Sequence, residues 1–201
     1  MVGPKPALLT ACAATEPLGS ASFVGRFTLI TGDVKRGKTR LTRRVLEAFC
    51  RDFPGPFTVI DLAPDLDHLG SRGRIDGLPI GGALIGPADC RIHYHHVRIT
   101  APRLEGADEQ ERQALAGDNR VRIERLFESA FATPIKTLFI NDCSLYLQAG
   151  PVAVLLGRIR SAATAVINGY YGRMLGPGRL SERERRGMDE LMAHCDQSIQ
   201  L

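Results

Sequence analysis

The sequence predicts a single α/β domain: a three-layer sandwich in which helices cover both faces of a mostly parallel sheet of five or six strands. Short apolar, β-branched runs alternate with segments whose apolar residues recur at helical spacing, and this alternation favours βαβ units. The length of 201 residues suits one domain with a sizeable core. Apolar residues make up 44% and charged residues 24% of the chain, as in soluble globular proteins.

The first residues are expected to lie outside this domain. Leu9–Cys12 has a short likeness to a lipoprotein signal, but Pro4 and Pro6 interrupt its apolar core, so we reject an export signal. We predict a flexible tail over residues 1–22 and one domain over residues 23–201. No apolar run approaches the roughly 20 residues that a membrane helix needs, so no membrane contact is expected.

Five stretches are predicted to be strands, because each is a short apolar run bounded by charge, glycine or proline. They are residues 27–31, 57–61, 91–100, 137–141 and 163–167. The connection over residues 62–90 is rich in Gly, Pro and Asp and predicts no regular element. A long connection of this kind is a place for a substrate-facing insertion.

Four helices are predicted around these strands. The first begins at Lys38, the second covers residues 108–132, and the third covers residues 152–162. Gly117 either weakens the second helix or divides it. Ser181 and Glu184 have the spacing of a capping box, which predicts the start of a last helix.

The segment between the first strand and the first helix carries the strongest functional signal. Residues 32–39 read GDVKRGKT, which matches the pattern G-x-x-x-x-G-K-[ST]. The glycines let successive backbone N–H groups turn inward around a phosphate, and the helix adds its unpaired N–H groups and positive dipole end. We expect Lys38 to contact the β- and γ-phosphates of a nucleotide and the Thr39 hydroxyl to be a Mg²⁺ ligand.

With this motif between a strand and a helix, the chain resembles the P-loop NTPase superfamily over residues 26–50. The resemblance implies binding of a nucleoside triphosphate and Mg²⁺ on an α/β sheet. The phosphate-binding residues that it implies are Gly32, Asp33, Val34, Lys35, Arg36, Gly37, Lys38, Thr39 and Arg40.

A nucleotide-bound Mg²⁺ also requires an acid at the C-terminal end of a strand. Asp142 follows the strand at 137–141 in the manner of a Walker B motif, and Asp61 ends the strand at 57–61. We prefer Asp142 and keep Asp61 as a competing or joint metal-binding and catalytic residue. Neither aspartate is followed by a glutamate, so hydrolysis is expected to be slow.

The run TVIDLAPD, which contains Asp61, resembles the second strand of the ParA- and dethiobiotin-synthetase-like class of P-loop proteins. In that class the aspartate lies near the metal and the attacking group. The class often has a lysine directly after the first glycine of the loop, where this chain has Asp33. The pattern therefore does not support an intersubunit role for Lys35.

Histidines form a second candidate site. His93 and His95 would share one face of a strand, where two imidazoles can bind a metal together with His68, Asp65 or Asp67. The simpler interpretation, which we favour, is a polar strand beside the active-site loop.

The segment after the last predicted strand is where such folds often contact a nucleobase. Only Asn168 fits the Asn-Lys-x-Asp pattern of a guanine-reading loop, so ATP is favoured over GTP. Tyr170 and Tyr171 either stack on a base or pack in the protein. Five arginines between Arg173 and Arg186 either supply a finger for the transferred phosphate or form a solvated helix face, which we favour.

Cysteine usage and charge bear on compartment and partners. The five cysteines are widely scattered and lack a C-x-x-C pair, which argues against a disulfide framework and a cysteine zinc site and favours the cytoplasm. The net charge is +4, and seven basic residues lie between Lys35 and Arg51. We interpret them as a basic rim around a phosphate site; without interleaved aromatic residues, nucleic-acid binding is not favoured.

Three functions follow from these observations. The first is Mg²⁺-dependent binding of a nucleoside triphosphate, with ATP favoured over GTP and slow phosphoanhydride hydrolysis. The second is a small-molecule kinase or ligase with its acceptor pocket in residues 62–100. The third is a non-hydrolysing switch that reports its nucleotide state to a protein partner or within a homodimer.

Overall fold

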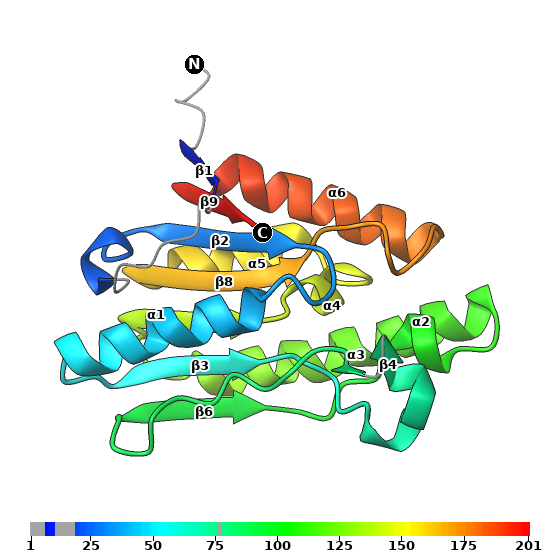
Figure 1. Cartoon of the computed structure of the whole chain (residues 1–201), viewed down its shortest axis with the longest axis horizontal. Helices are drawn as coiled ribbons and strands as arrows, with labels where there is room; N and C mark the ends of the chain where they lie inside the picture. Colours follow the sequence, from blue (N-terminus) through cyan, green and yellow to red (C-terminus); the bar gives the residue numbers. More distant parts are fainter. Residues whose placement is uncertain (1–6, 11–18, 76–77) are drawn as a thin grey trace.

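A computed structural model of the chain describes residues 7–10, 19–75 and 78–201 and has a parallel sheet at its centre (Figure 1). The strand order is β1-β9-β2-β8-β7-β3-β6. All of these strand pairs are parallel. The strands are β1 (Ala7–Thr10), β2 (Phe27–Gly32), β3 (Phe57–Asp61), β6 (Ile92–His96), β7 (Thr137–Asn141), β8 (Thr164–Tyr170) and β9 (Gln197–Gln200).

Helices cover both faces of this sheet, which confirms the predicted three-layer α/β fold. They are α1 (Lys38–Asp52), α2 (Pro102–Glu105), α3 (Glu109–Ala130), α4 (Ser144–Leu147), α5 (Val152–Arg160) and α6 (Arg179–His194). Successive side chains of a strand point to opposite faces of the sheet. In β2, Leu29 belongs to the core between the sheet and helices α3 to α6, and its neighbour Ile30 belongs to the core between the sheet and α1. The central strands β2 and β7 are therefore buried along their whole length, as expected for parallel strands covered on both sides.

The strand order decides which residues meet at the functional edge. β8 lies between β2 and β7, and β3 follows β7. Because all four strands run in the same direction, their C-terminal ends share the edge towards which the arrows point in Figure 1. The loop after β2 therefore faces the residues that end β8, β7 and β3.

Most of the predicted elements are confirmed. β3 and β7 have the predicted bounds, and β2 and α1 begin at the predicted residues. α3 is one continuous helix despite Gly117, around which a Cβ atom would meet nothing within 4 Å. The strand predicted at 91–100 is shorter, because regular pairing with β3 ends at His96.

Two predictions about the chain's ends are corrected. Residues 1–22 are not a tail throughout, because Ala7–Thr10 pairs with β9 and Ser20–Ser22 forms a short 3₁₀ helix, η1. The last helix does not start in a capping box at Ser181. α6 begins at Arg179, and the Ser181 hydroxyl donates to the carbonyl of Gly176 at 2.8 Å.

Several short elements were not predicted from the sequence. β9 is a polar strand that gives no apolar signal, yet it pairs with both β2 and β1. With β9, six strands form the body of the sheet, and β1 adds a seventh at its edge. Within residues 62–90 lie the 3₁₀ segment η2 (Asp67–Gly73) and a small antiparallel pair, β4 (Arg74–Ile75) and β5 (Leu78–Pro79). No described helix is long and apolar enough to cross a membrane.

The expectation of no disulfide is wrong for one pair. Cys50, near the end of α1, is bonded to Cys90, just before β6, with a Cα–Cα distance of 5.5 Å. The two cysteines are 40 residues apart in sequence and meet because both lie near the start of β3, where the Phe57 amide donates to the Arg91 carbonyl. Cys143 and Cys195 are free and buried, and Cys12 lies outside the described residues.

Candidate functional site

The loop after β2 has the backbone conformation that its glycines permit. Gly37 precedes α1 with a φ of 89°, and the Leu41 amide donates to its carbonyl at 2.9 Å. Gly32 ends β2 in a crowded position, where a Cβ atom would lie 2.7 Å from the carbonyl oxygen of Leu201. The turn therefore depends on glycine at both ends, and the first turn of α1 points its unpaired N–H groups towards the functional edge.

A pocket of about 230 Å³ lies over this loop. One wall consists of loop and α1 residues, including Lys38 and Thr39, and the opposite wall contains Asn141, Asp142 and Asn168 from the ends of β7 and β8. The third wall is the segment 80–82. The structure thus brings Asp142 to the same pocket as Lys38 and Thr39.

Lys38 is held over the loop. Its Nζ donates to the carbonyl oxygen of Asp33 at 2.7 Å. Burial lowers the pKa of Lys38, and the carboxylates of Asp142 and Asp33 act in the opposite direction. The ammonium is therefore partly desolvated beside a carboxylate, an environment in which an arriving phosphate would be strongly attracted.

Thr39 contacts Asn141, the residue before the expected acid. The Thr39 hydroxyl donates to Asn141 Oδ1 at 3.2 Å. Asn141 Nδ2 in turn donates to Asp61 Oδ1 at 2.8 Å and to the Gly82 carbonyl at 2.9 Å. A neutral amide thus stands next to the candidate metal-binding hydroxyl, and the sequence analysis missed it.

Asp61 lies at the end of β3 but directs both carboxylate oxygens to protein donors. Oδ1 accepts from Asn141 at 2.8 Å and from the Ala63 amide at 3.1 Å. Oδ2 accepts from the Leu84 amide and from the Tyr94 hydroxyl, both at 2.7 Å. The residue is only 4% exposed. Direct metal binding by Asp61 would break these bonds, so its geometry suits a positioning residue for Asn141.

Asn168 at the end of β8 joins the same network. Its Nδ2 donates to Thr42 Oγ1 and to Asn141 Oδ1, both at 2.9 Å, and its Oδ1 accepts from the Asp142 amide at 3.0 Å. These bonds occupy its side chain inside the protein. This network of side-chain amides therefore holds three elements in place relative to one another: the helix α1, the strand β7 and the strand β8.

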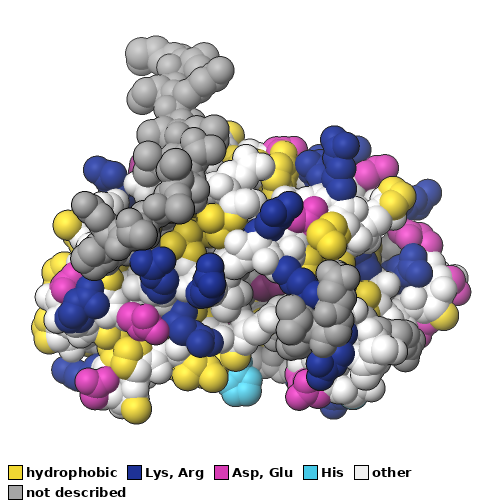
Figure 2. Space-filling model, in the orientation of Figure 1, with side chains coloured by type: hydrophobic (Ala, Val, Ile, Leu, Met, Phe, Trp, Pro, Cys, Tyr) yellow, Lys and Arg dark blue, Asp and Glu magenta, His cyan; other side chains and the backbone are white. Residues whose placement is uncertain are grey.

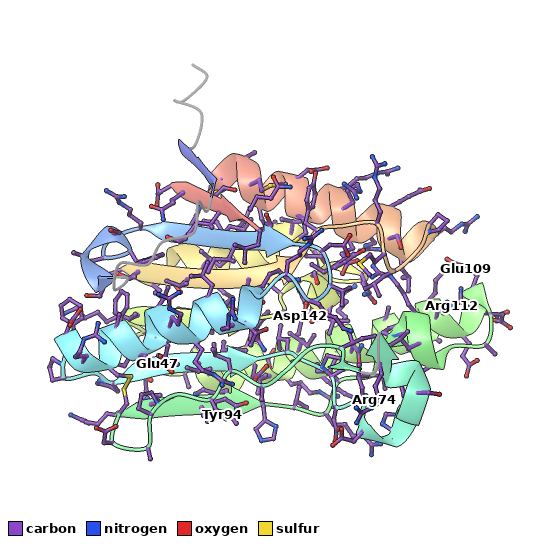
Figure 3. All side chains as sticks on the ribbon, in the orientation of Figure 1. Glu47, Arg74, Tyr94, Glu109, Arg112 and Asp142 are labelled. Atoms are coloured by element: carbon purple, nitrogen blue, oxygen red, sulfur yellow. A yellow bond between two sulfur atoms is a disulfide. The ribbon has the colours of Figure 1, made fainter. Side chains whose placement is uncertain are left out.

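Asp142, labelled in Figure 3, is the acid that lines the pocket. It has a positive φ of 58°, which turns its side chain out of the β7 register, and its Oδ1 accepts from the Ser144 hydroxyl at 2.8 Å. Burial raises the pKa of Asp142, although the Ser144 bond and Lys38 act to lower it. A carboxylate with a raised pKa close to Lys38 is suited to accept a proton.

Asp33, which stands where the related class often has a lysine, clamps the loop after β8. Burial acts to raise the pKa of Asp33, but backbone N–H groups outweigh it and lower the pKa. Its Oδ1 accepts from the Val34 amide at 2.7 Å, and its Oδ2 accepts from the Arg173 amide at 2.9 Å and the Met174 amide at 3.4 Å. Gly172 makes this approach possible, because a Cβ atom there would lie 2.3 Å from the Asp33 carboxyl carbon.

The remaining loop residues divide between core and rim. Val34 is buried, whereas Lys35, Arg36 and Arg40 are exposed. Lys35 and Arg40 also line the pocket. Figure 2 shows basic side chains over the face that α1 forms, in agreement with the predicted basic rim.

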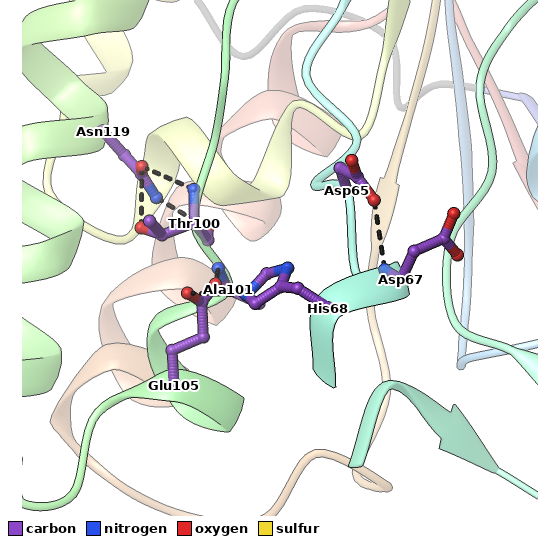
Figure 4. A network of polar contacts seen from close by, with 7 residues as sticks. All are labelled: Asp65, Asp67, His68, Thr100, Ala101, Glu105 and Asn119. Atoms are coloured by element: carbon purple, nitrogen blue, oxygen red, sulfur yellow. Dashed lines mark hydrogen bonds and ion pairs between the residues drawn. The ribbon is translucent and has the colours of Figure 1, made fainter. Parts of the chain in front are cut away.

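The histidines are not gathered into a metal site in the described part of the chain, where no group of three or more metal-binding side chains occurs. His68 instead contacts Glu105 Oε2 at 3.3 Å, within the polar network that holds η2 near α2 (Figure 4). Burial lowers the pKa of His95, and His93 lowers it further. Tyr94, between them, is the β6 residue that reaches the Asp61 network.

The two tyrosines after β8 have different surroundings. The Tyr170 ring lies within cation–π distance of two cations, with Lys38 Nζ 5.9 Å and Arg103 Cζ 5.5 Å from its centroid. Tyr171 packs against Arg185 at 4.7 Å and donates to Asp189. Two of the five nearby arginines donate hydrogen bonds to backbone carbonyls. Arg183 donates to the carbonyl of Ala149, and Arg185 donates to the carbonyl of Gly172.

A groove of about 800 Å³ lies beside the pocket, over residues 61–68 and 80–83 and the end of β6. It shares the wall formed by Ala63 and residues 80–82 with the pocket. Most of its lining falls in the range 62–100.

Fold and site together define a three-layer α/β protein with a glycine loop at the C-terminal edge of a parallel sheet, opposite an aspartate and two asparagines. Comparison with protein-family models gives no match, and a search of curated proteins finds no significantly similar sequence.

Proposed function

We propose that the chain binds a nucleoside triphosphate, with ATP favoured over GTP, in the pocket over residues 32–39 and hydrolyses it slowly. The observation that carries this proposal is that the glycine loop, Lys38, Thr39 and Asp142 all line one pocket of about 230 Å³. Lys38 binds the β- and γ-phosphates, and the loop backbone surrounds them.

The residues around Thr39 fit a magnesium ion. Thr39 Oγ1 and the Asp142 carboxylate are oxygen ligands, the class of ligand that Mg²⁺ prefers. When bound, the ion would neutralise charge on the phosphates. Only Asp142 of these two carries a charge, so we expect the magnesium requirement to depend mainly on this residue and on the nucleotide itself.

Hydrolysis in this site is expected to be slow. Asp142, which Ser144 and the Asn168 contact to the Asp142 amide hold in place, is assigned to the magnesium ion. No second carboxylate among the described residues lines the pocket, so none is at hand to take a proton from the attacking water.

The test of this proposal is isothermal titration with ATP and with GTP, each with and without Mg²⁺. We expect micromolar binding of one nucleotide, strengthened by Mg²⁺. Lys38→Ala should weaken binding by about ten- to hundredfold, because it removes a charge-assisted contact worth about 1.5–3 kcal/mol. Lys136→Ala is the matched control, since Lys136 is exposed before β7 at the opposite edge of the sheet. Equal affinity of both variants would refute the assignment.

A small-molecule kinase is the second candidate, and the groove of about 800 Å³ favours it. The groove adjoins the proposed phosphate pocket across Ala63 and residues 80–82, so an acceptor bound there would lie near the nucleotide. This version predicts that a metabolite, rather than water alone, stimulates nucleotide turnover.

A further inference from the structure

The strand β6 forms one edge of the sheet. In the strand order of the described residues its single neighbour is β3, and Figure 1 shows β6 along the lower margin of the molecule. The disulfide between Cys50 and Cys90 holds the start of β6 against α1. The fold therefore fixes the position of this edge, while its outer side is open to a further strand.

The backbone groups on the outer side of β6 belong to Ile92, Tyr94 and His96. In the parallel ladder Phe57 is aligned with Ile92, and the Phe57 amide donates to the carbonyl of Arg91. Because the ladder alternates, every second residue from Arg91 onwards turns its backbone towards β3, and the residues between them turn theirs away. No turn or loop of the described chain bonds to the backbone of these outward-facing residues. The edge thus offers three donors and three acceptors to another strand.

β6 lacks the features that usually keep an edge strand from pairing. None of its five residues is Lys, Pro, Asp or Glu, and its alignment with β3 runs without a bulge. Two exposed apolar side chains flank it, with Tyr94 42% and Ile85 63% exposed. They lie near each other, because Leu84, the neighbour of Ile85, donates to the same Asp61 oxygen as the Tyr94 hydroxyl. A strand added at this edge would therefore cover apolar surface as well as backbone groups.

We propose that β6 pairs antiparallel with β6 of a second copy of this chain, with Tyr94 on the two-fold axis, so that the two sheets become one. In this register Tyr94 lies opposite Tyr94 and Ile92 lies opposite His96, so the outward-facing residues form the hydrogen-bonded pairs of the ladder. All five residues of both strands are then paired. A shift by one residue would set outward-facing groups against groups already turned to β3, and a shift by two would leave the strand ends unpaired.

A second copy suits this edge because the edge is complementary to itself in charge as well as in backbone pattern. Continued past the strand ends, the register places Arg98 opposite Cys90 of the second copy, which is the residue next to Asp89. Arg98 and Asp89 are exposed, and neither forms an ion pair among the described residues. The two-fold axis creates this Arg–Asp approach twice, so opposite charges meet at both ends of the interface.

The first test is the mass of the unaltered full chain in solution. Sedimentation velocity over a range of concentrations should show a reversible dimer with twice the mass of the single chain. Lys38→Ala should form the same dimer, because no β6 residue lines the proposed phosphate pocket, and this keeps the result independent of the nucleotide assignment. A chain that stays monomeric across the accessible concentrations would overturn the proposal.

Two double variants with matched positions test the interface and its register. His93 would lie opposite His95 of the second copy, and both side chains are at least partly exposed. His93→Lys with His95→Lys opposes like charges twice and should weaken the dimer at least about tenfold. His93→Glu with His95→Lys alters the same side chains but opposes unlike charges, so it should keep the dimer. An unchanged dimer in the first variant would remove β6 from the interface, and loss of the dimer in both would overturn the register.

Cysteine cross-linking tests the position of the axis. Cα atoms of a hydrogen-bonded antiparallel pair are about 5.5 Å apart, which is within reach of a disulfide. Tyr94→Cys should therefore give an interchain disulfide on mild oxidation, with the unaltered chain as control. His93→Cys should not, because its two copies would be displaced by two residues along the strands, beyond the roughly 7 Å that a disulfide spans. Cross-linking of His93→Cys but not of Tyr94→Cys would overturn the proposed axis.

Discussion

Asn141 connects three parts of the chain that lie far apart in sequence. It accepts from Thr39 and Asn168 and donates to Asp61 and to the carbonyl of Gly82, so both of its amide hydrogens and its oxygen are engaged. An aspartate at this position would look like a better metal ligand, but it would replace two donors with acceptors. The amide is therefore required by the network around it.

Replacing Asn141 with Asp should destabilise the fold by about 2–3 kcal/mol at neutral pH, because two buried donors are lost and two carboxylates come into contact. The repulsion raises the folded-state pKa of the coupled pair above its unfolded value. The unfolded chain then binds fewer protons than the folded one, so the deficit grows as pH rises above the unfolded pKa and shrinks below it. Urea denaturation across this pH range measures the effect, and the pair Asp61→Asn with Asn141→Asp should recover part of the loss. A deficit independent of pH would contradict the carboxylate contact.

Asp142 sets the pH dependence of turnover. Burial raises its pKa, and a carboxylate that binds Mg²⁺ must be deprotonated, so kcat/KM at limiting Mg²⁺ should rise with pH through a pKa above the usual range of an aspartate. Asp142→Asn should lower turnover at that Mg²⁺ concentration by at least about tenfold and remove this limb of the profile. The comparison of pH–rate profiles checks both. Asp61→Asn serves as the contrast, since Asp61 faces protein donors: a loss of the same limb in that variant would transfer the role to Asp61.

At the scale of elements, two helical glycines differ in their surroundings. A Cβ atom at Gly117 of α3 would meet nothing within 4 Å, whereas one at Gly187 of α6 would lie 3.2 Å from three side-chain atoms of Leu147. Gly117→Ala should stabilise the protein by about 0.5–1 kcal/mol through helix propensity alone. Gly187→Ala should gain less or destabilise, because α4 must move away from α6. Thermal unfolding of the two variants side by side measures the difference, and equal shifts would argue against close packing of α4 on α6.

Local pattern sufficed for the elements whose residues carry their own signal. β3, β7 and the glycine loop were predicted correctly because apolar runs and the spacing of Gly32, Gly37 and Lys38 encode them within a few residues. β9 was not predicted, because a polar strand is recognised only by the strands that it pairs with. The start of α6 was not predicted either, because its N-cap residue Gly178 has no side chain that would mark it in the sequence. The candidate site shows the same division. Lys38 and Asp142 were predicted, whereas the Asn141 network and the Asp33 clamp depend on contacts across more than a hundred residues.

At the scale of the whole molecule, one covalent link joins the α1 layer to the edge of the sheet. Cys50 and Cys90 enclose β3 and the entire insertion over residues 62–89, including the wall of the proposed phosphate pocket. The bond therefore restricts the unfolded chain over a separation of 40 residues. Such a link is common in oxidising compartments and unusual in the cytoplasm, which was predicted from the number and spacing of the cysteines.

Removing this link should lower the stability of the chain without changing the pocket. For a loop of this size, Cys50→Ser with Cys90→Ser should reduce the free energy of unfolding by about 2–4 kcal/mol, since the unfolded ensemble gains conformational freedom. Urea denaturation with and without a reductant measures the loss, and the reductant should lower the unaltered chain to the level of the double variant. The double variant should not respond to the reductant, because Cys143 and Cys195 are free thiols. Nucleotide affinity should be retained both in the reduced unaltered chain and in the double variant, because the disulfide lies near the start of β3, at the edge opposite the pocket. A reductant that leaves the unaltered chain as stable as before would show that the two thiols are not bonded in solution.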